Sequence, residues 1–188
     1  MKTSNQYEAI VIGTSAGGLT ALTTILRMLP ESYTVPILLV QHRARNSPAL
    51  FEDVLQNKCQ LAIKQADEKE AIRPGRVYVA PPDYHMLVEA DRTISLSVEP
   101  PVQYSRPSID VLFESAAMAY RDKLVGIILS GSNSDGAAGI RTINTLGGLA
   151  IAQNPKEAQY PFMPQAAIDT GAVHVVWGLE EIGEFLKG

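Results

Sequence analysis

The sequence is poor in cysteine, with Cys59 as its single representative among 188 residues. One cysteine cannot form a disulfide within the chain, and it cannot supply the several thiolates that a structural metal site requires. We therefore expect Cys59 to be a buried, inert thiol.

Long apolar runs, an apolar leader and basic clusters are also missing. The longest apolar runs, "VPILLV" and "LVGIIL", are far too short to span a bilayer. The first residues, "MKTSNQYEA", contain no apolar stretch of the kind found in signal peptides. Lysine and arginine are scattered and the net charge is −4, which disfavours nucleic acid as a partner. These absences predict a soluble, cytoplasmic protein without membrane insertion.

The material that is present suits one globular domain. Hydrophobic residues make up 46% of the chain and charged residues 19%, so a sizeable core can form. A length of 188 residues predicts a single domain over residues 1–188. No internal repeat, low-complexity segment or interdomain linker is visible.

Short β-branched runs alternate with helical stretches along the chain. The runs "VPILLV" and "VGIILS" are apolar without alternation, which is typical of strands covered on both faces by helices. The pattern predicts an α/β fold: a doubly wound, mostly parallel, Rossmann-like sheet flanked by helices. Residues 85–99, "HMLVEADRTISLSVE", instead predict an antiparallel hairpin at one end of the sheet, with a tight Ala-Asp turn.

Element boundaries follow from these runs and from the prolines. The expected strands are residues 9–13, 36–41, 61–66, 77–80, 125–130, 149–153 and 173–176. The expected helices are residues 17–29, 48–57, 107–120, 136–146, 164–170 and 179–186, with Pro48, Pro107 and Pro164 each suited to a first helical turn.

The stretch "IVIGTSAGGL" joins the first expected strand to the first helix. It nearly matches the dinucleotide-binding pattern G-x-G-x-x-G, but Ser15 replaces the middle glycine, which lets a pyrophosphate approach the backbone. The acidic residue that would bind the ribose is also missing, because the second strand ends in Gln41-His42. The same residues match G-x-S-x-G, the pattern of a nucleophile on a sharp strand-to-helix turn. Ser15 is therefore either a nucleophile or the cap of the helix that follows.

A nucleophilic serine needs a base, and the base needs an orienting group. His42 directly follows the second strand, whereas His85 begins the hairpin and His174 lies inside a strand-like run. Asp135 follows the buried run "LVGIILS", where it could also serve as the cap of the next helix. In an open parallel sheet, sites form beyond the carboxyl ends of the strands. Ser15, His42 and Asp135 are all expected at that edge.

Several motifs in order give the chain a resemblance to a known family. They are "VIGTSAGGL", "VQH", "RPGRVYVAPPDYHMLVE", "SRPSIDVLFESAA", "SGSNSDGAAGI" and "GGLAIAQ…MPQAAIDTGAV". With these, nearly the whole chain resembles the catalytic domain of the CheB-type protein-glutamate methylesterases of bacterial chemotaxis, a two-component signal transduction system. The resemblance implies a doubly wound sheet with a hairpin. It also implies a triad of Ser15 as nucleophile, His42 as base and Asp135 as its orienting group.

The resemblance further implies hydrolysis of γ-glutamyl methyl esters on a chemoreceptor helical bundle, with release of methanol and without metal or cofactor. Backbone N–H groups of Ala16 and Ser132 are the expected oxyanion donors. Here the family's usual loop T-G-M-G-x-D-G-A reads "SGSNSDGA", so Ser132 stands where the family has methionine. Arg106 and Met163 are candidate substrate-lining residues, although Arg106 could equally be a surface arginine. The loop "NPKEAQYPFMP" could dock a partner or pack onto the core.

Other functions stay open. The same chemistry could serve glutamine deamidation or hydrolysis of another small ester, and a non-catalytic signalling or binding module could keep the fold. Chemotaxis members carry an N-terminal receiver domain, whereas here the first strand begins at about Ala9. We therefore expect a stand-alone catalytic domain with an open site, controlled either by a separate partner, such as a response regulator or a methyltransferase, or by the availability of substrate.

Overall fold

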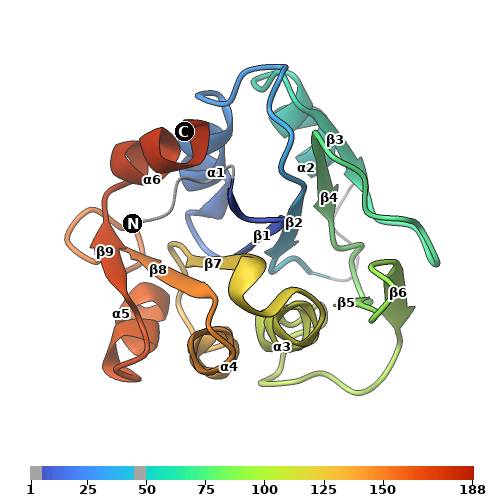
Figure 1. The fold of residues 1–188 in the computed structure, drawn as a ribbon. Coiled ribbons are helices and arrows are strands. Elements are labelled where there is room, and N and C mark those ends of the chain that lie inside the picture. Colours follow the sequence, from blue (N-terminus) through green and yellow to red (C-terminus); the bar gives the residue numbers. More distant parts are fainter. Residues whose placement is uncertain (1–5, 45–49) are drawn as a thin grey trace.

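The computed structural model describes residues 6–44 and 50–188 (Figure 1). Its main sheet has seven strands in the order β3-β4-β2-β1-β7-β8-β9, and every neighbouring pair is parallel. The strands are β1 (Ala9–Thr14), β2 (Ile37–Gln41), β3 (Ala62–Gln65), β4 (Arg76–Val79), β7 (Leu124–Ile128), β8 (Leu149–Gln153) and β9 (Val175–Trp177). The predicted doubly wound parallel sheet is confirmed.

Helices cover both faces of this sheet (Figure 1). They are α1 (Gly18–Leu26), α2 (Leu50–Gln56), α3 (Ile109–Tyr120), α4 (Ala137–Thr145), α5 (Phe162–Asp169) and α6 (Leu179–Lys187). The 3₁₀ turn η2 (Arg121–Lys123) links α3 to β7. Every residue of β1, β2, β7 and β8 is buried, because each strand packs against helices on both sides.

Successive residues of each strand point alternately into two separate hydrophobic cores, one on each face of the sheet. On one face Ile10 and Ile12 of β1 pack with α1, α2 and α6. On the other face Ala9 and Val11 pack with α3, α4 and α5. The alternation of strand residues between the two faces cannot be seen in the sequence, because the residues on both faces are apolar.

The predicted hairpin forms a separate two-stranded antiparallel sheet of β5 (His85–Val88) and β6 (Ile94–Ser97). Its turn is centred on Ala90 and Asp91, because Arg92 N–H donates to the Glu89 carbonyl at 2.8 Å. Met86 and Ile94 extend the core that contains α3. The hairpin therefore supports the helix on which part of the site is built.

Element boundaries differ from the expected ones by a few residues at most. The helix expected at residues 107–120 begins at Ile109, since Ser108 is its N-cap residue and has an extended conformation. The helix expected at 164–170 begins earlier, at Phe162. The expected start of the second helix, at Pro48, lies outside the described residues. In the described part of the chain, no helix is long and apolar enough to cross a membrane.

The strand order reverses at β1, which pairs with β2 on one side and β7 on the other. In open α/β sheets this reversal opens a crevice at the carboxyl ends of the strands. The segments that follow β1, β2 and β7 therefore meet beyond one edge of the sheet, and they contain Ser15, His42 and Asp135.

Candidate active site

A cleft of about 520 Å³ opens at this edge. Ser15 and His42 line it, as do Asn133 and Tyr104. The cleft is open to solvent on one side, so a group carried by a large molecule can enter it. Its position matches the edge at which the sequence predicts a site.

Hydrogen bonds to Ser130, in the segment that follows β7, fix the loop that carries Ser15. Ser15 N–H donates to the Ser130 carbonyl at 3.0 Å, and Thr14 Oγ1 donates to the same carbonyl at 2.8 Å. The chain then turns through Gly17, whose φ of 78° suits glycine, into α1. Because Gly17 is the N-cap residue of α1, the alternative that Ser15 caps this helix is wrong.

Gln41 joins this loop to the one that carries His42. Its side-chain Nε2 donates to the carbonyls of Ser15 at 2.8 Å and of His42 at 2.9 Å. A side chain at Gly18 would collide with Gln41 Oε1, at 2.2 Å from an added Cβ. The glycine at position 18 therefore allows the amide to bridge the two loops.

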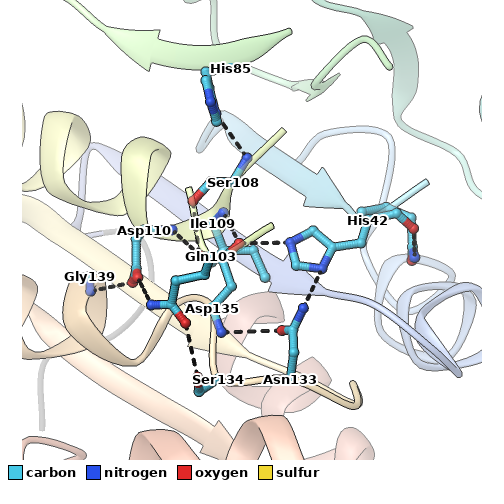
Figure 2. A network of polar contacts seen from close by, with 11 residues as sticks. His42, His85, Gln103, Ser108, Ile109, Asp110, Asn133, Ser134, Asp135 and Gly139 are labelled. Atoms are coloured by element: carbon cyan, nitrogen blue, oxygen red, sulfur yellow. Dashed lines mark hydrogen bonds and ion pairs between the residues drawn. The ribbon is translucent and has the colours of Figure 1, made fainter. Parts of the chain in front are cut away.

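His42 and Asp135 form a short contact, with 2.7 Å between Nε2 and Oδ2 (Figure 2). A carboxylate only accepts hydrogen bonds, so Nε2 carries the proton and Nδ1 carries the lone pair. Backbone geometry supports the arrangement, since His42 N–H donates to the Thr14 carbonyl at 3.0 Å. The ring nitrogen left to act as a base is therefore Nδ1.

Asp135 is fully buried and lies against the N-terminus of α3. Ile109 N–H donates to its Oδ2 at 2.7 Å. Its Oδ1 accepts Asp110 N–H at 3.0 Å and Ser108 Oγ at 2.8 Å. Burial alone would raise the pKa of Asp135, but the hydrogen bonds from His42 and α3 outweigh it and keep this pKa below the ordinary value.

The alternative that Asp135 caps the helix following it in sequence is wrong. Gly136 is the N-cap residue of α4, with φ of 98°. The carboxylate instead satisfies the first N–H groups of α3, which begins 26 positions earlier at Ile109. The positive end of the α3 dipole favours the ionised form.

Asn133 contacts the remaining ring nitrogen of His42. Its Nδ2 lies 3.3 Å from Nδ1 (Figure 2), and its Oδ1 accepts Asp135 N–H at 3.2 Å. In the described part of the chain, no hydrogen bond joins Ser15 Oγ to His42. Sequence reasoning missed Asn133, although this position carries glycine in the family loop pattern.

The other two histidines have different surroundings. His85 is buried, accepts Ser108 N–H at Nδ1 and lies 3.2 Å from the Pro100 carbonyl through Nε2. It therefore supports Ser108, which in turn contacts Asp135. His174 accepts Ala150 N–H at the edge of the sheet. Of the three histidines, only His42 lines the cleft.

The expected oxyanion donors lie on the segments that follow β1 and β7. Within residues 6–44 and 50–188, the backbone N–H groups of Ala16 and Ser132 have no hydrogen-bond partner. The loop of Ser132 is fixed by Ser130 Oγ, which donates to the Ala16 carbonyl at 2.8 Å. Neither residue is among those that line the cleft, so their role as oxyanion donors stays a prediction.

Arg106 and Met163, the candidate substrate-lining residues, lie in different places. Arg106 lines the cleft, but its guanidinium contacts Asp83 at 2.6 Å and the carbonyls of Val98 and Glu99. Met163 is 1% exposed and packs beneath Gly131, outside the lining of the cleft. The substrate-lining role of either side chain stays a prediction.

The loop "NPKEAQYPFMP" packs onto the core through one side chain, and its docking role stays a prediction. Met163 packs inward, whereas Tyr160 and Phe162 are 41% and 58% exposed. The two aromatic side chains and Ser132 line a second, apolar hollow of about 410 Å³.

Comparison with known proteins gives consistent matches over the whole fold. The family model described as CheB methylesterase matches residues 10–186. A putative protein-glutamate methylesterase/protein-glutamine glutaminase of Leptospira interrogans is 51% identical, over 95% of this chain and 92% of that protein.

Two further matches extend the comparison. A protein of Clostridium acetobutylicum named protein-glutamate methylesterase/protein-glutamine glutaminase is 35% identical, over 96% of this chain and 52% of that protein. The crystal structure of the Thermotoga maritima CheB methylesterase catalytic domain superposes with a TM-score of 0.90 at 30% identity, covering 96% of this chain and 97% of that one.

Proposed function

Because the chain belongs to the CheB methylesterase family, we propose that it hydrolyses methyl esters of glutamate side chains on proteins. The observation that carries the proposal is the pair of His42 and the buried Asp135, 2.7 Å apart, in which the histidine lines the same cleft as Ser15 and keeps Nδ1 for the role of base. A serine and a histidine in one cleft, with a buried carboxylate bound to the histidine, are the components of a serine hydrolase.

The first half of the reaction forms an acyl-enzyme. Ser15 Oγ attacks the ester carbonyl while His42 Nδ1 removes its proton. Asp135 holds the ring through Nε2 and stabilises the imidazolium that results. The oxyanion lies against the N–H groups of Ala16 and Ser132. His42 then returns the proton to the departing methoxide, and methanol leaves.

In the second half, water attacks the acyl-enzyme with His42 again acting as the base. The ester bond to Ser15 breaks, His42 returns the proton to the serine, and the glutamic acid product releases its own proton to solvent as it becomes the carboxylate. His42 carries the proton in each transfer to or from Ser15, so the proposed mechanism requires no cofactor or metal ion.

Glutamine deamidation is a second candidate, favoured by the two-part name of both relatives. An amide would pass through the same acyl-enzyme, with ammonia leaving in place of methanol. An amide nitrogen is a poorer leaving group than methoxide, so the ester is expected to react faster at one site.

The substrate class follows from the openness of the cleft and from the family. A glutamyl side chain on the surface of a long helix can reach Ser15 without the helix entering the protein. We infer that the partner is the methylated helical bundle of a chemoreceptor in the cytoplasm.

A serine-directed fluorophosphonate probe and a methanol-release assay together test the proposal. We expect Ser15 to be labelled in the wild-type protein, and methylated receptor to release methanol. Ser15→Ala should lose both signals, by roughly 10⁴-fold or more in turnover. Ser105→Ala, which changes another hydroxyl at the same cleft, is the matched control. Methanol release by Ser15→Ala would exclude this nucleophile, and an unlabelled, inactive wild-type protein would favour a non-catalytic module.

A further inference from the structure

Both ring nitrogens of His42 have partners in this structure. Nε2 donates to Asp135 at 2.7 Å, and Nδ1 faces Nδ2 of Asn133 at 3.3 Å. The mechanism needs Nδ1 to accept the proton of Ser15. A neutral imidazole has one lone pair in the plane of the ring, so Nδ1 accepts one well-aligned donor at a time.

The orientation of the Asn133 amide is fixed from its other end. Its Oδ1 accepts Asp135 N–H at 3.2 Å, a contact between residues two positions apart that is common for asparagine in turns. An amide whose oxygen is used in this way presents its NH₂ group to the ring (Figure 2). The contact is therefore a hydrogen bond from Asn133 to the neutral histidine.

The length of this bond is informative. The separation of 3.3 Å is slightly beyond the usual N–H donor range of about 2.7–3.2 Å. The bond between Asn133 and His42 is thus weaker than the one that holds Asp135. Asn133 also lines the cleft itself, where an entering substrate meets it.

We propose that Asn133 is a positioning residue that occupies the base nitrogen of His42 in the resting site. When substrate binds productively, Nδ1 must stop accepting a hydrogen bond from the Asn133 amide and accept one from the Ser15 hydroxyl instead. The inference rests on the proposed roles of Ser15 and His42. It adds a step to them, because the nucleophile is activated only after the amide has moved.

Three substitutions separate the amide donor from the turn that it supports. Asn133→Ala removes both hydrogen bonds of the side chain. Asn133→Ser keeps an oxygen that can accept Asp135 N–H but is too short to reach the ring, so it should preserve the loop. The matched control is Ser134→Ala, which removes the hydrogen bond from the neighbouring residue to Gln103 Oε1 and leaves His42 untouched.

The first readout is the rate at which a fluorophosphonate labels Ser15, together with turnover of a small ester. Losing one net hydrogen bond that competes with Ser15 should raise both rates about two- to tenfold in Asn133→Ala and Asn133→Ser. Ser134→Ala should stay within about twofold of the wild type. Unchanged or lower rates in Asn133→Ser would overturn the inference.

The second readout does not depend on activity. In protein with ¹⁵N-labelled histidine, the Nδ1 resonance of His42, assigned by its loss in His42→Ala, should shift in Asn133→Ser, while Nε2 stays protonated. A resonance that does not respond would mean that the amide does not contact Nδ1 in solution. Loss of activity in Ser15→Ala, together with no response to Asn133, would reject this inference and leave the proposed function intact. Persistent activity in Ser15→Ala would reject the proposed function.

Discussion

The Asp110 carboxylate is buried next to the site and should weaken the fold at neutral pH. It lies in the first turn of α3, 4% exposed, where Oδ1 accepts Gly139 N–H at 2.7 Å and Oδ2 accepts Gln103 Nε2 at 2.8 Å. Burial, with a smaller contribution from the charge of Asp135, raises its pKa from 3.8 to about 6. Asp110→Asn should therefore stabilise the protein.

The size of the gain follows from the pKa. Asp110 ionises less readily in the folded state than in the unfolded one, so the free energy of unfolding falls as pH rises from about 4 to 6. The folded pKa exceeds the unfolded pKa by about 2, and each pKa unit is worth 1.36 kcal/mol. At pH 8, ionised Asp110 therefore lowers the free energy of unfolding by about 3 kcal/mol, which Asp110→Asn should recover. At pH 5 the folded carboxyl is mostly protonated, and the expected gain in the free energy of unfolding is about 1.6 kcal/mol.

Asparagine can occupy this position without leaving a polar atom unpaired. Its oxygen can still accept Gly139 N–H. Its NH₂ group requires an acceptor, which Gln103 supplies if its amide rotates by half a turn. Ser134 Oγ, which now donates to Gln103 Oε1 at 2.9 Å, would then accept from the Gln103 nitrogen. The three side chains thus keep their hydrogen bonds with reversed polarity.

Urea unfolding at pH 5 and pH 8 checks this prediction. The advantage of Asp110→Asn should grow by about 1.4 kcal/mol between the two values of pH. The exposed Asp53, changed to asparagine, is the control and should alter stability by less than about 0.5 kcal/mol at both. A variant less stable than wild type at pH 8, or a gain independent of pH, would refute the reasoning.

Three further predictions concern the site. His42→Ala and Asp135→Asn should each abolish most methanol release, and combining either with Ser15→Ala should add little, since residues that act as a unit are not additive. Because the folded pKa of Asp135 is lowered, its carboxylate stabilises the protein at pH values above the unfolded pKa of about 3.8. This stabilisation should disappear as the pH falls below that value, and acid unfolding of the wild type compared with Asp135→Asn measures the loss. Tyr104, fully exposed at the cleft, should contact the protein substrate, so Tyr104→Ala should raise KM severalfold for methylated receptor and leave small-ester turnover unchanged. Met118→Ala, on an exposed part of α3, is its control; an unchanged KM would exclude the contact.

The sequence was sufficient to predict the parallel sheet, because the strands of this sheet are buried on both faces. Uninterrupted apolar runs such as residues 36–40 are rarely compatible with another environment. The position of the candidate site followed from the same fact, since parallel strands bring their carboxyl ends to one edge. Ser15, His42 and Asp135 could be selected in this way without any knowledge of side-chain contacts.

Contacts between segments that are distant in sequence could not be predicted from the sequence. Nothing near Asp135 in the chain indicates that its carboxylate meets the N-terminus of α3, so the neighbouring α4 was the obvious alternative. The bridging amide of Gln41 and the contact of Asn133 with His42 depend on loop conformations that residue types do not determine. Likewise, "YPFMP" contains several apolar side chains, and only the start of α5 at Phe162 determines that Met163 points inward.

The pairing of β1 with β7 also affects how the protein is made. Thr14 and the residue whose carbonyl it binds, Ser130, are 116 positions apart. At about 5–20 residues per second, a ribosome takes roughly 6–23 s to synthesise that interval. During this time β1 can pair with β2, but its other edge stays open and apolar, as in strands prone to aggregation. The central strand of the finished sheet is therefore an edge strand in the nascent chain, and slow translation between β2 and β7 should increase its need for chaperones.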